Sequence, residues 1–81
     1  MIMTEQRIQK KRIKQLEEDG YYVIKLTVTN KNGIPDLIAI PKDSNVLFVE
    51  CKTKQGKVSE LQKYRLKELK QYAKTEVYRG D

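Results

Sequence analysis

The chain has 81 residues, which suffice for one small domain, and we expect residues 1–81 to form that single domain. It contains no histidine and a single cysteine, Cys51, which excludes an internal disulfide, a Cys/His zinc site, a Ser-His-Asp triad and a Cys-His catalytic pair. Seventeen Lys and Arg residues against eleven Asp and Glu residues leave a net charge of +6, which favours a polyanionic partner, above all nucleic acid.

A membrane surface is the alternative partner for a basic domain. However, no apolar run approaches the roughly 18 residues that a membrane span needs. Residues 1–5 also lack the charged-then-apolar pattern of a signal peptide. We therefore expect a soluble protein of a reducing compartment, without a membrane partner.

The first half of the chain predicts a helix followed by a strand. The segment from about Thr4 to Asp19 has helical periodicity and is followed by Gly20, a helix stop signal. Residues 21–29 alternate with period two, as expected of a half-buried strand, and residues 30–33 read as a turn. Glu5 and Gln9 are polar residues inside the apolar sector of the predicted helix.

The second half predicts a hairpin, a helix and a last strand. Two strands, 35–40 and 46–53, are joined by a hairpin loop over residues 41–45. A second helix begins after Ser59 as N-cap and runs to about Lys74, and a last strand covers residues 76–79. The order αβββαβ predicts an α/β fold in which helices cover a sheet. One side of the second helix carries a basic stripe, which is either a solvated face or a DNA contact: Lys63, Lys67, Lys70 and Lys74.

Asp36 and Glu50 stand on the two strands of the predicted hairpin. If the hairpin folds about Asp43, Asp36 faces Glu50. Directly opposed side chains have Cβ atoms roughly 4.5–5.5 Å apart, and like charges there are destabilising. A cation is therefore expected between them, and Mg²⁺ is suited because it takes oxygen ligands, usually one or two carboxylates with water and phosphate.

Lys52 follows Glu50 by two residues and therefore lies on the same face of its strand. The alternative is a surface Asp-Glu-Lys cluster on a solvated sheet face, because exposed ion pairs are common and weak. Both carboxylates adjoin apolar runs, 37–40 and 46–49, and this context favours a functional site. Metal-assisted phosphodiester hydrolysis by carboxylates and a lysine needs no histidine.

The residues around this pair resemble the virus-type replication-repair nuclease family, VRR-NUC, of the PD-(D/E)XK nuclease superfamily. The similar segments are Gly33–Ile38, Phe48–Thr53 and Ser59–Gln62. They contain Pro35-Asp36 and Glu50-Cys51-Lys52, separated by thirteen residues. The resemblance extends from about Glu5 to Tyr78. It implies a restriction-endonuclease-like fold with a central mixed sheet and flanking helices.

The resemblance also implies the composition of the active site. Asp36 and Glu50 would bind Mg²⁺ or Mn²⁺, with the backbone carbonyl of Cys51 as a further ligand. Lys52 would stabilise the phosphate during attack or help to activate the attacking water. The catalytic set would comprise Asp36, Glu50, Lys52 and Gln62.

Glu5 and Gln62 each have a structural alternative. The resemblance implies that Glu5 reaches the metal site from the first helix, directly or through water, but an acidic residue in the first turn also stabilises a helix N-terminus. Gln62 would line the active site, but Ser59 and Gln62 also have the spacing of a capping box. The Cys51 side chain is expected to be a small buried hydrophobe.

The expected activity is cleavage of DNA, with branched, flap or four-way substrates implied by the resemblance. No organic cofactor is expected. The alternatives are a non-catalytic nucleic-acid-binding module with the same fold and, less favoured, a small anion-binding or toxin-like interaction domain. The resemblance places the protein in the cytoplasm of a bacterium or a virus-infected host cell. A closed homodimer is expected, because so small a core needs a further source of stability and the stand-alone viral relatives are dimeric.

Overall fold

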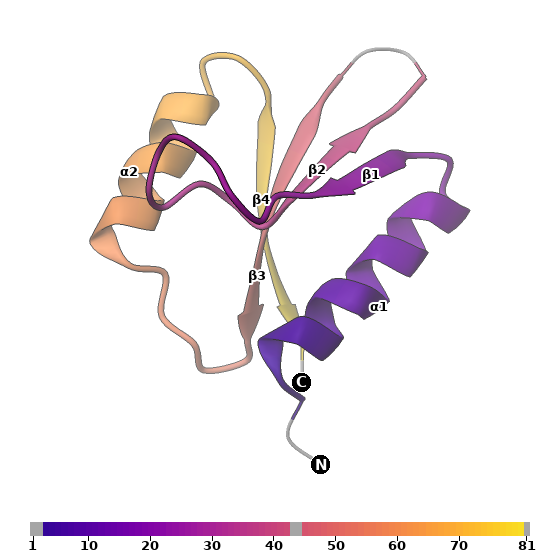
Figure 1. The fold of residues 1–81 in the computed structure, drawn as a ribbon, viewed down its shortest axis with the longest axis horizontal. Helices are drawn as coiled ribbons and strands as arrows, with labels where there is room; N and C mark the ends of the chain where they lie inside the picture. Colours follow the sequence, from indigo (N-terminus) through magenta and orange to yellow (C-terminus); the bar gives the residue numbers. More distant parts are fainter. Residues whose placement is uncertain (1–2, 43–44, 81) are drawn as a thin grey trace.

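The computed structural model describes residues 3–42 and 45–80, and it has the predicted order of elements (Figure 1). The elements are α1 (Glu5–Glu18), β1 (Tyr22–Lys25), β2 (Leu37–Ile40), β3 (Leu47–Thr53), α2 (Glu60–Leu69) and β4 (Lys74–Gly80). The strands form one sheet in the order β1-β2-β3-β4, with β1/β2 and β2/β3 antiparallel and β3/β4 parallel. The predicted α/β fold with a mixed sheet and flanking helices is confirmed.

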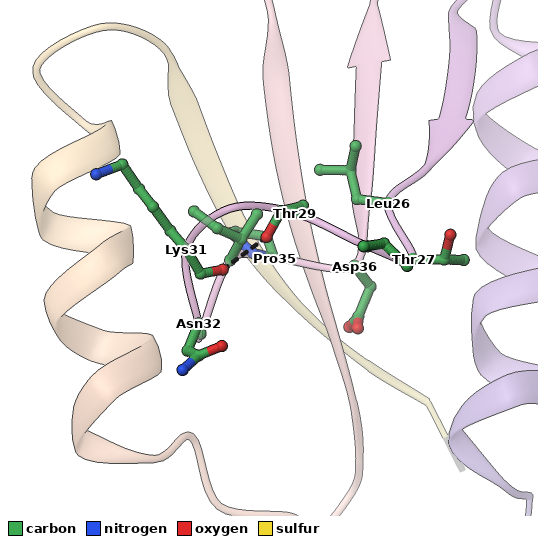
Figure 2. Close-up of a pocket in the computed structure, with 10 residues that line it drawn as sticks. Leu26, Thr27, Thr29, Lys31, Asn32, Pro35 and Asp36 are labelled. Carbon is green, nitrogen blue, oxygen red and sulfur yellow. Dashed lines mark hydrogen bonds between the residues drawn. The ribbon is translucent and has the colours of Figure 1, made fainter.

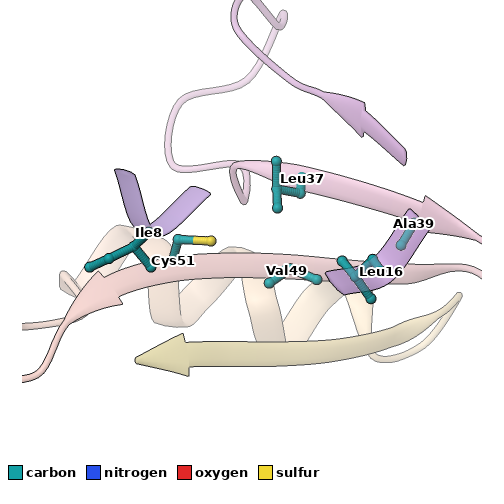
Figure 3. Packing of buried hydrophobic residues seen from close by; sticks show 6 residues of the cluster. All are labelled: Ile8, Leu16, Leu37, Ala39, Val49 and Cys51. Atoms are coloured by element: carbon teal, nitrogen blue, oxygen red, sulfur yellow. The ribbon is translucent and has the colours of Figure 1, made fainter. Parts of the chain in front are cut away.

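Helix α1 has the predicted extent and contributes Ile8 and Leu16 to the core. The Thr4 side chain caps it by accepting a hydrogen bond from the backbone N–H of Arg7 at 3.2 Å. Its apolar side packs on one face of the sheet (Figure 3), and the buried core residues are Ile8, Leu16, Leu37, Ala39, Val49 and Cys51. The Arg12 guanidinium also pairs with Glu76 of β4 at 2.9 Å and stacks over the Tyr78 ring.

Helix α2 lies on the opposite side of the sheet, toward β4 (Figure 1). Its predicted end at Lys74 is wrong, because the helix stops at Leu69 and β4 already begins at Lys74. The backbone N–H of Lys74 donates to the Val46 carbonyl at 3.0 Å, just before Leu47 and Lys74 pair in the parallel ladder. The chain must therefore reach the sheet by residue 74, and sheet pairing overrides local helix propensity.

Strand β1 is shorter than predicted, because residues 26–29 belong to a long loop that reaches α2. The first bond of this loop is still sheet-like, since Leu26 N–H donates to the Asp36 carbonyl at 2.8 Å. Arg65 then holds the loop by donating to the Asn32 carbonyl at 3.0 Å. Gly33 adopts a φ of 80° and packs against Leu61 so closely that a Cβ would lie 2.7 Å from Leu61 Cγ. This docking delivers residues 34–36 to the start of β2.

No helix in the described ranges is long and apolar enough to cross a membrane. Residues 43 and 44, including the predicted centre of the hairpin at Asp43, lie outside the described residues.

Candidate active site

The hairpin has the register that brings Asp36 and Glu50 together. Leu37 pairs with Val49 and Ile38 with Phe48, so Asp36, one residue before β2, stands beside Glu50 of β3. An Asp36 carboxylate oxygen accepts a hydrogen bond from the backbone N–H of Cys51 at 2.8 Å. Figure 2 shows the Asp36 side chain pointing away from the neighbouring loop, toward the end of the sheet where both helices begin. Just before the start of β2, the Asp36 carboxylate thus accepts a hydrogen bond from the backbone of β3.

Glu50 and Lys52 are buried on the α2 side of the sheet. Glu50 is 1% exposed and Lys52 is 8% exposed, which excludes the alternative of a solvated surface cluster. Lys52 Nζ lies 3.7 Å from Glu50 Oε2. The other oxygen, Oε1, is buried and has no hydrogen-bond partner in the described part of the chain. A buried carboxylate with an unsatisfied oxygen is costly unless a cation or proton occupies the place.

Gln62 performs both of the roles that its sequence position left open. Its Oε1 accepts a hydrogen bond from the backbone N–H of Ser59 at 2.9 Å, and the Ser59 hydroxyl accepts from the backbone N–H of Gln62 at 3.1 Å, which completes a capping box. Its Nε2 donates to Glu50 Oε2 at 3.1 Å. One amide therefore ties the start of α2 to the buried carboxylate of β3.

The electrostatics of the pair favour a cation. Burial, together with the adjacent Asp36, raises the pKa of Glu50 from 4.5 to about 8, while Lys52 opposes the rise. A proton on one carboxyl allows the two groups to coexist, and a divalent cation would do the same. The donor set of two carboxylates, one with an unpartnered oxygen, fits Mg²⁺ or Mn²⁺ completed by water and phosphate.

The two further predicted metal ligands differ in how well they are placed. The N–H and C=O of one residue in an extended strand point to the same side, so the Cys51 carbonyl faces the Asp36 side, as its N–H does. Glu5 is exposed on the first turn of α1, and its charge contributes to the raised pKa of Glu50. Within residues 3–42 and 45–80, no three acidic, Cys or His side chains converge on one point. A role of Glu5 in metal binding, direct or through water, stays a prediction.

The Cys51 side chain points the other way, into the core beneath α1. Burial, together with the charges of Asp36 and Glu50, raises the pKa of its thiol to about 12. It is therefore a small hydrophobe at physiological pH.

The predicted basic stripe does not run along one helix. Lys63 and Lys67 are exposed on α2, Lys70 caps its C-terminus, and Lys74 begins β4. Lys63 is near the N-terminal end of α2, where Gln62 meets Glu50, whereas Lys70 and Lys74 lie at the opposite end. Contact of these lysines with DNA stays a prediction.

Comparison with known proteins identifies the family. The model of the VRR-NUC domain family matches residues 3–81. The chain belongs to the VRR-NUC family. A solved structure described as a VRR-NUC domain is 30% identical and superposes with a TM-score of 0.82, covering 95% of this chain and 84% of that one. No curated protein matches the chain significantly.

As a VRR-NUC domain, the chain is a nuclease-type domain with DNA as its partner, in a family that is generally metal-dependent. Two arginines near the site, Arg65 and Arg79, were not predicted to take part in it. Both donate hydrogen bonds to backbone carbonyls of loops beside the site, and the pattern of a single sequence carries no signal for such contacts.

The double role of Gln62 is testable with a matched pair of variants. Ser59→Ala removes the cap alone and is expected to cost about 1 kcal/mol of stability while retaining most DNA cleavage. Gln62→Ala also leaves Glu50 without its amide donor, so we expect a similar loss of stability together with a fall in cleavage of at least tenfold. Urea unfolding and single-turnover cleavage measure the two effects. Equal activity of the two variants would reduce Gln62 to a cap.

Proposed function

We propose that this VRR-NUC domain is a Mg²⁺- or Mn²⁺-dependent DNA endonuclease that hydrolyses phosphodiester bonds in branched, flap or four-way DNA and leaves a 5′-phosphate. The observation that carries this proposal is the buried carboxylate pair, in which Glu50 retains an unpartnered oxygen beside Asp36 and Lys52. A module that only binds DNA has no need of two like charges held together at such a cost.

Each side chain then has a distinct task. Asp36, Glu50 and the Cys51 carbonyl would hold the divalent cation, which supplies Lewis acidity that polarises a phosphate and makes a water more acidic. The Cys51 N–H fixes the orientation of the Asp36 carboxylate, and Gln62 fixes that of Glu50. Lys52 places a positive charge, shielded from bulk water, beside the position where negative charge develops on the phosphate.

Cleavage of supercoiled plasmid tests the activity. We expect nicking with Mg²⁺ or Mn²⁺, none with EDTA, and a faster reaction on four-way or flap oligonucleotides than on linear duplex. Binding of DNA without cleavage under any divalent ion would instead favour the non-catalytic module with the same fold. The cytoplasm of a bacterium or virus-infected cell is the compartment we propose for this activity.

A second copy of the chain is the partner that we propose for the uncovered part of the sheet. On the α2 side of the sheet, β1 and β2 carry two pairs of cross-strand neighbours, Tyr22 with Ile40 and Ile24 with Ile38. Tyr22 is 71% exposed and Ile24 is 42% exposed. A two-fold axis would bury this apolar patch against itself and would supply the two active sites needed to cut two strands.

The dimer is tested by changing the charge of this patch. Ile24→Glu is expected to raise the dimer dissociation constant by at least about tenfold, because the interface would have to bury an unpaired carboxylate. Val28→Glu is the matched control, since Val28 is 91% exposed and lies outside the patch. Sedimentation velocity at micromolar concentration measures both. A wild-type monomer that is fully active on four-way DNA would contradict the dimer.

A further inference from the structure

A basic pocket lies on the loop between β3 and α2, next to the proposed active site. Four of its lining residues are cationic: Lys54, Lys57, Lys63 and Arg79. It has a volume of about 410 Å³ and is open to solvent. Lys63 pairs with the Glu60 carboxylate at 3.7 Å, and both side chains of that pair are well exposed. Such an ion pair is weak and exchanges readily for a stronger anion.

Gly56 connects this pocket to the buried Lys52. A Cβ at Gly56 would lie 3.6 Å from Lys52 Cδ and 2.9 Å from Thr53 Oγ1, so the loop backbone packs directly against the stem of the lysine. The pocket, which Gly56 helps to line, therefore adjoins the aliphatic stem of Lys52. A polyanion with one phosphate at Asp36, Glu50 and Lys52 would then have the neighbouring part of its backbone near this pocket.

Arg79 from β4 builds the wall of the pocket. Its Nη1 donates to the carbonyls of Thr53 at 3.1 Å and Lys54 at 3.5 Å, and also to the Gly56 carbonyl. These bonds fix the loop against the sheet. Among the described residues, all hydrogen bonds of Arg79 use Nη1, and its Nη2 and Nε hydrogens have no acceptor there. A guanidinium edge with these donors suits a phosphate, which accepts two parallel hydrogen bonds.

We propose that the pocket of Lys54, Lys57, Lys63 and Arg79 binds a DNA backbone phosphate adjacent to the one that is cleaved. The inference rests on the proposed nuclease function and adds to it a specific anchor for the substrate. It assigns Lys63 a role apart from the other lysines of the predicted stripe. It also explains why Arg79 donates hydrogen bonds to three carbonyls of one loop. These bonds would keep a fixed distance between the anchored phosphate and Lys52.

The test is a thermodynamic cycle that combines removal of lysine charges from the protein with removal of single phosphate charges from the DNA. The parent protein carries Glu50→Gln, so that DNA stays intact, and binds a flap oligonucleotide in which a neutral methylphosphonate replaces one phosphate at a time around the mapped cleavage position. The pocket variant adds Lys57→Gln and Lys63→Gln. The matched control adds Lys11→Gln and Lys14→Gln, which remove the same charge from exposed positions on α1, across the sheet. Fluorescence anisotropy gives each affinity.

At one position next to the cleaved bond, we expect the methylphosphonate to weaken binding to the parent by about tenfold and to leave binding to the pocket variant almost unchanged. The α1 control should lose the same factor as the parent there. On unmodified DNA the salt dependence of the pocket variant should fall by about one phosphate contact, since both lysines serve a single phosphate.

Equal losses in parent and pocket variant at every scanned position would overturn the pocket. If the wild-type protein still cleaves DNA in that case, the nuclease function stands and only the anchor is wrong. Absence of DNA cleavage by the wild-type protein with every divalent ion would overturn the nuclease function, whatever the result of the cycle. Absence of DNA binding would overturn both.

Discussion

Asp36→Asn and Glu50→Gln are each expected to reduce metal-dependent DNA cleavage by at least about 10³-fold while the protein remains folded. Cation binding and phosphate polarisation together would lower the barrier by several kcal/mol, and each variant removes one of the two carboxylates that would hold the cation. Single-turnover cleavage with Mg²⁺ and with Mn²⁺ measures the loss. Near wild-type rates in either variant would show that the active site lies elsewhere.

The pH dependence of stability provides an independent check of the same pair. Because the pKa of Glu50 is about 8 in the folded protein and near 4.5 when exposed, the folded state keeps a proton that the unfolded chain releases. The metal-free wild-type protein should therefore lose stability as pH rises from about 4.5 to above 8. Glu50→Gln removes this group and should escape the loss.

Thermal unfolding in EDTA at pH 5 and at pH 8.5 separates the two proteins. We expect similar Tm values at the acidic pH and a higher Tm for Glu50→Gln at the alkaline pH. Addition of Mg²⁺ or Mn²⁺ at pH 8.5 should raise the Tm of the wild type and leave that of the variant almost unchanged. A wild-type Tm that changes neither with pH nor with divalent ions would contradict the buried pair of repelling carboxylates.

Lys52→Met is expected to lower single-turnover cleavage by about 10²- to 10⁴-fold and to change DNA affinity only modestly. The lysine is 8% exposed and lies 3.7 Å from Glu50, so its charge would act mainly at the reacting phosphate and would contribute little to binding the rest of the DNA. Methionine keeps the aliphatic stem that packs against Gly56, which separates loss of charge from loss of packing.

Lys14→Met is the matched control for Lys52→Met, because it removes one exposed charge from α1. Its cleavage rate should stay within about twofold of the wild type. If Lys52→Met loses affinity and rate by equal factors, Lys52 is a phosphate anchor and contributes nothing specific to the chemical step.

Much of the architecture follows from local patterns in this chain. The extent of α1 follows from a capping threonine, helical periodicity and Gly20. The opposition of Asp36 and Glu50 follows from the hairpin register, since period-two patterning leaves no freedom to slip by one residue without exposing the core. The pattern Pro35-Asp36 and Glu50-Cys51-Lys52 indicated the VRR-NUC family, which comparison then confirmed.

Other features depend on contacts between residues far apart in sequence. Parallel pairing with β3 ends α2 at Leu69 and starts β4 at Lys74, although the segment between them has helical periodicity. The loop after β1 leaves the sheet because Arg65 and Leu61 of α2 hold it, a contact that no local pattern of residues 26–35 contains.

The sequence by itself determined the chemistry available to this protein: no histidine, one cysteine, and two carboxylates and a lysine in a register that forces them together. Only the tertiary structure decided how deeply these groups are buried and which hydrogen bonds they make. Three features arise where separate elements meet. They are the burial of Glu50, the Gln62 amide that caps a helix and donates to a carboxylate, and the hydrogen bonds from Arg79 to the β3–α2 loop. Desolvation and long-range hydrogen bonds are properties of packed elements, and periodicity along one strand or helix does not encode them.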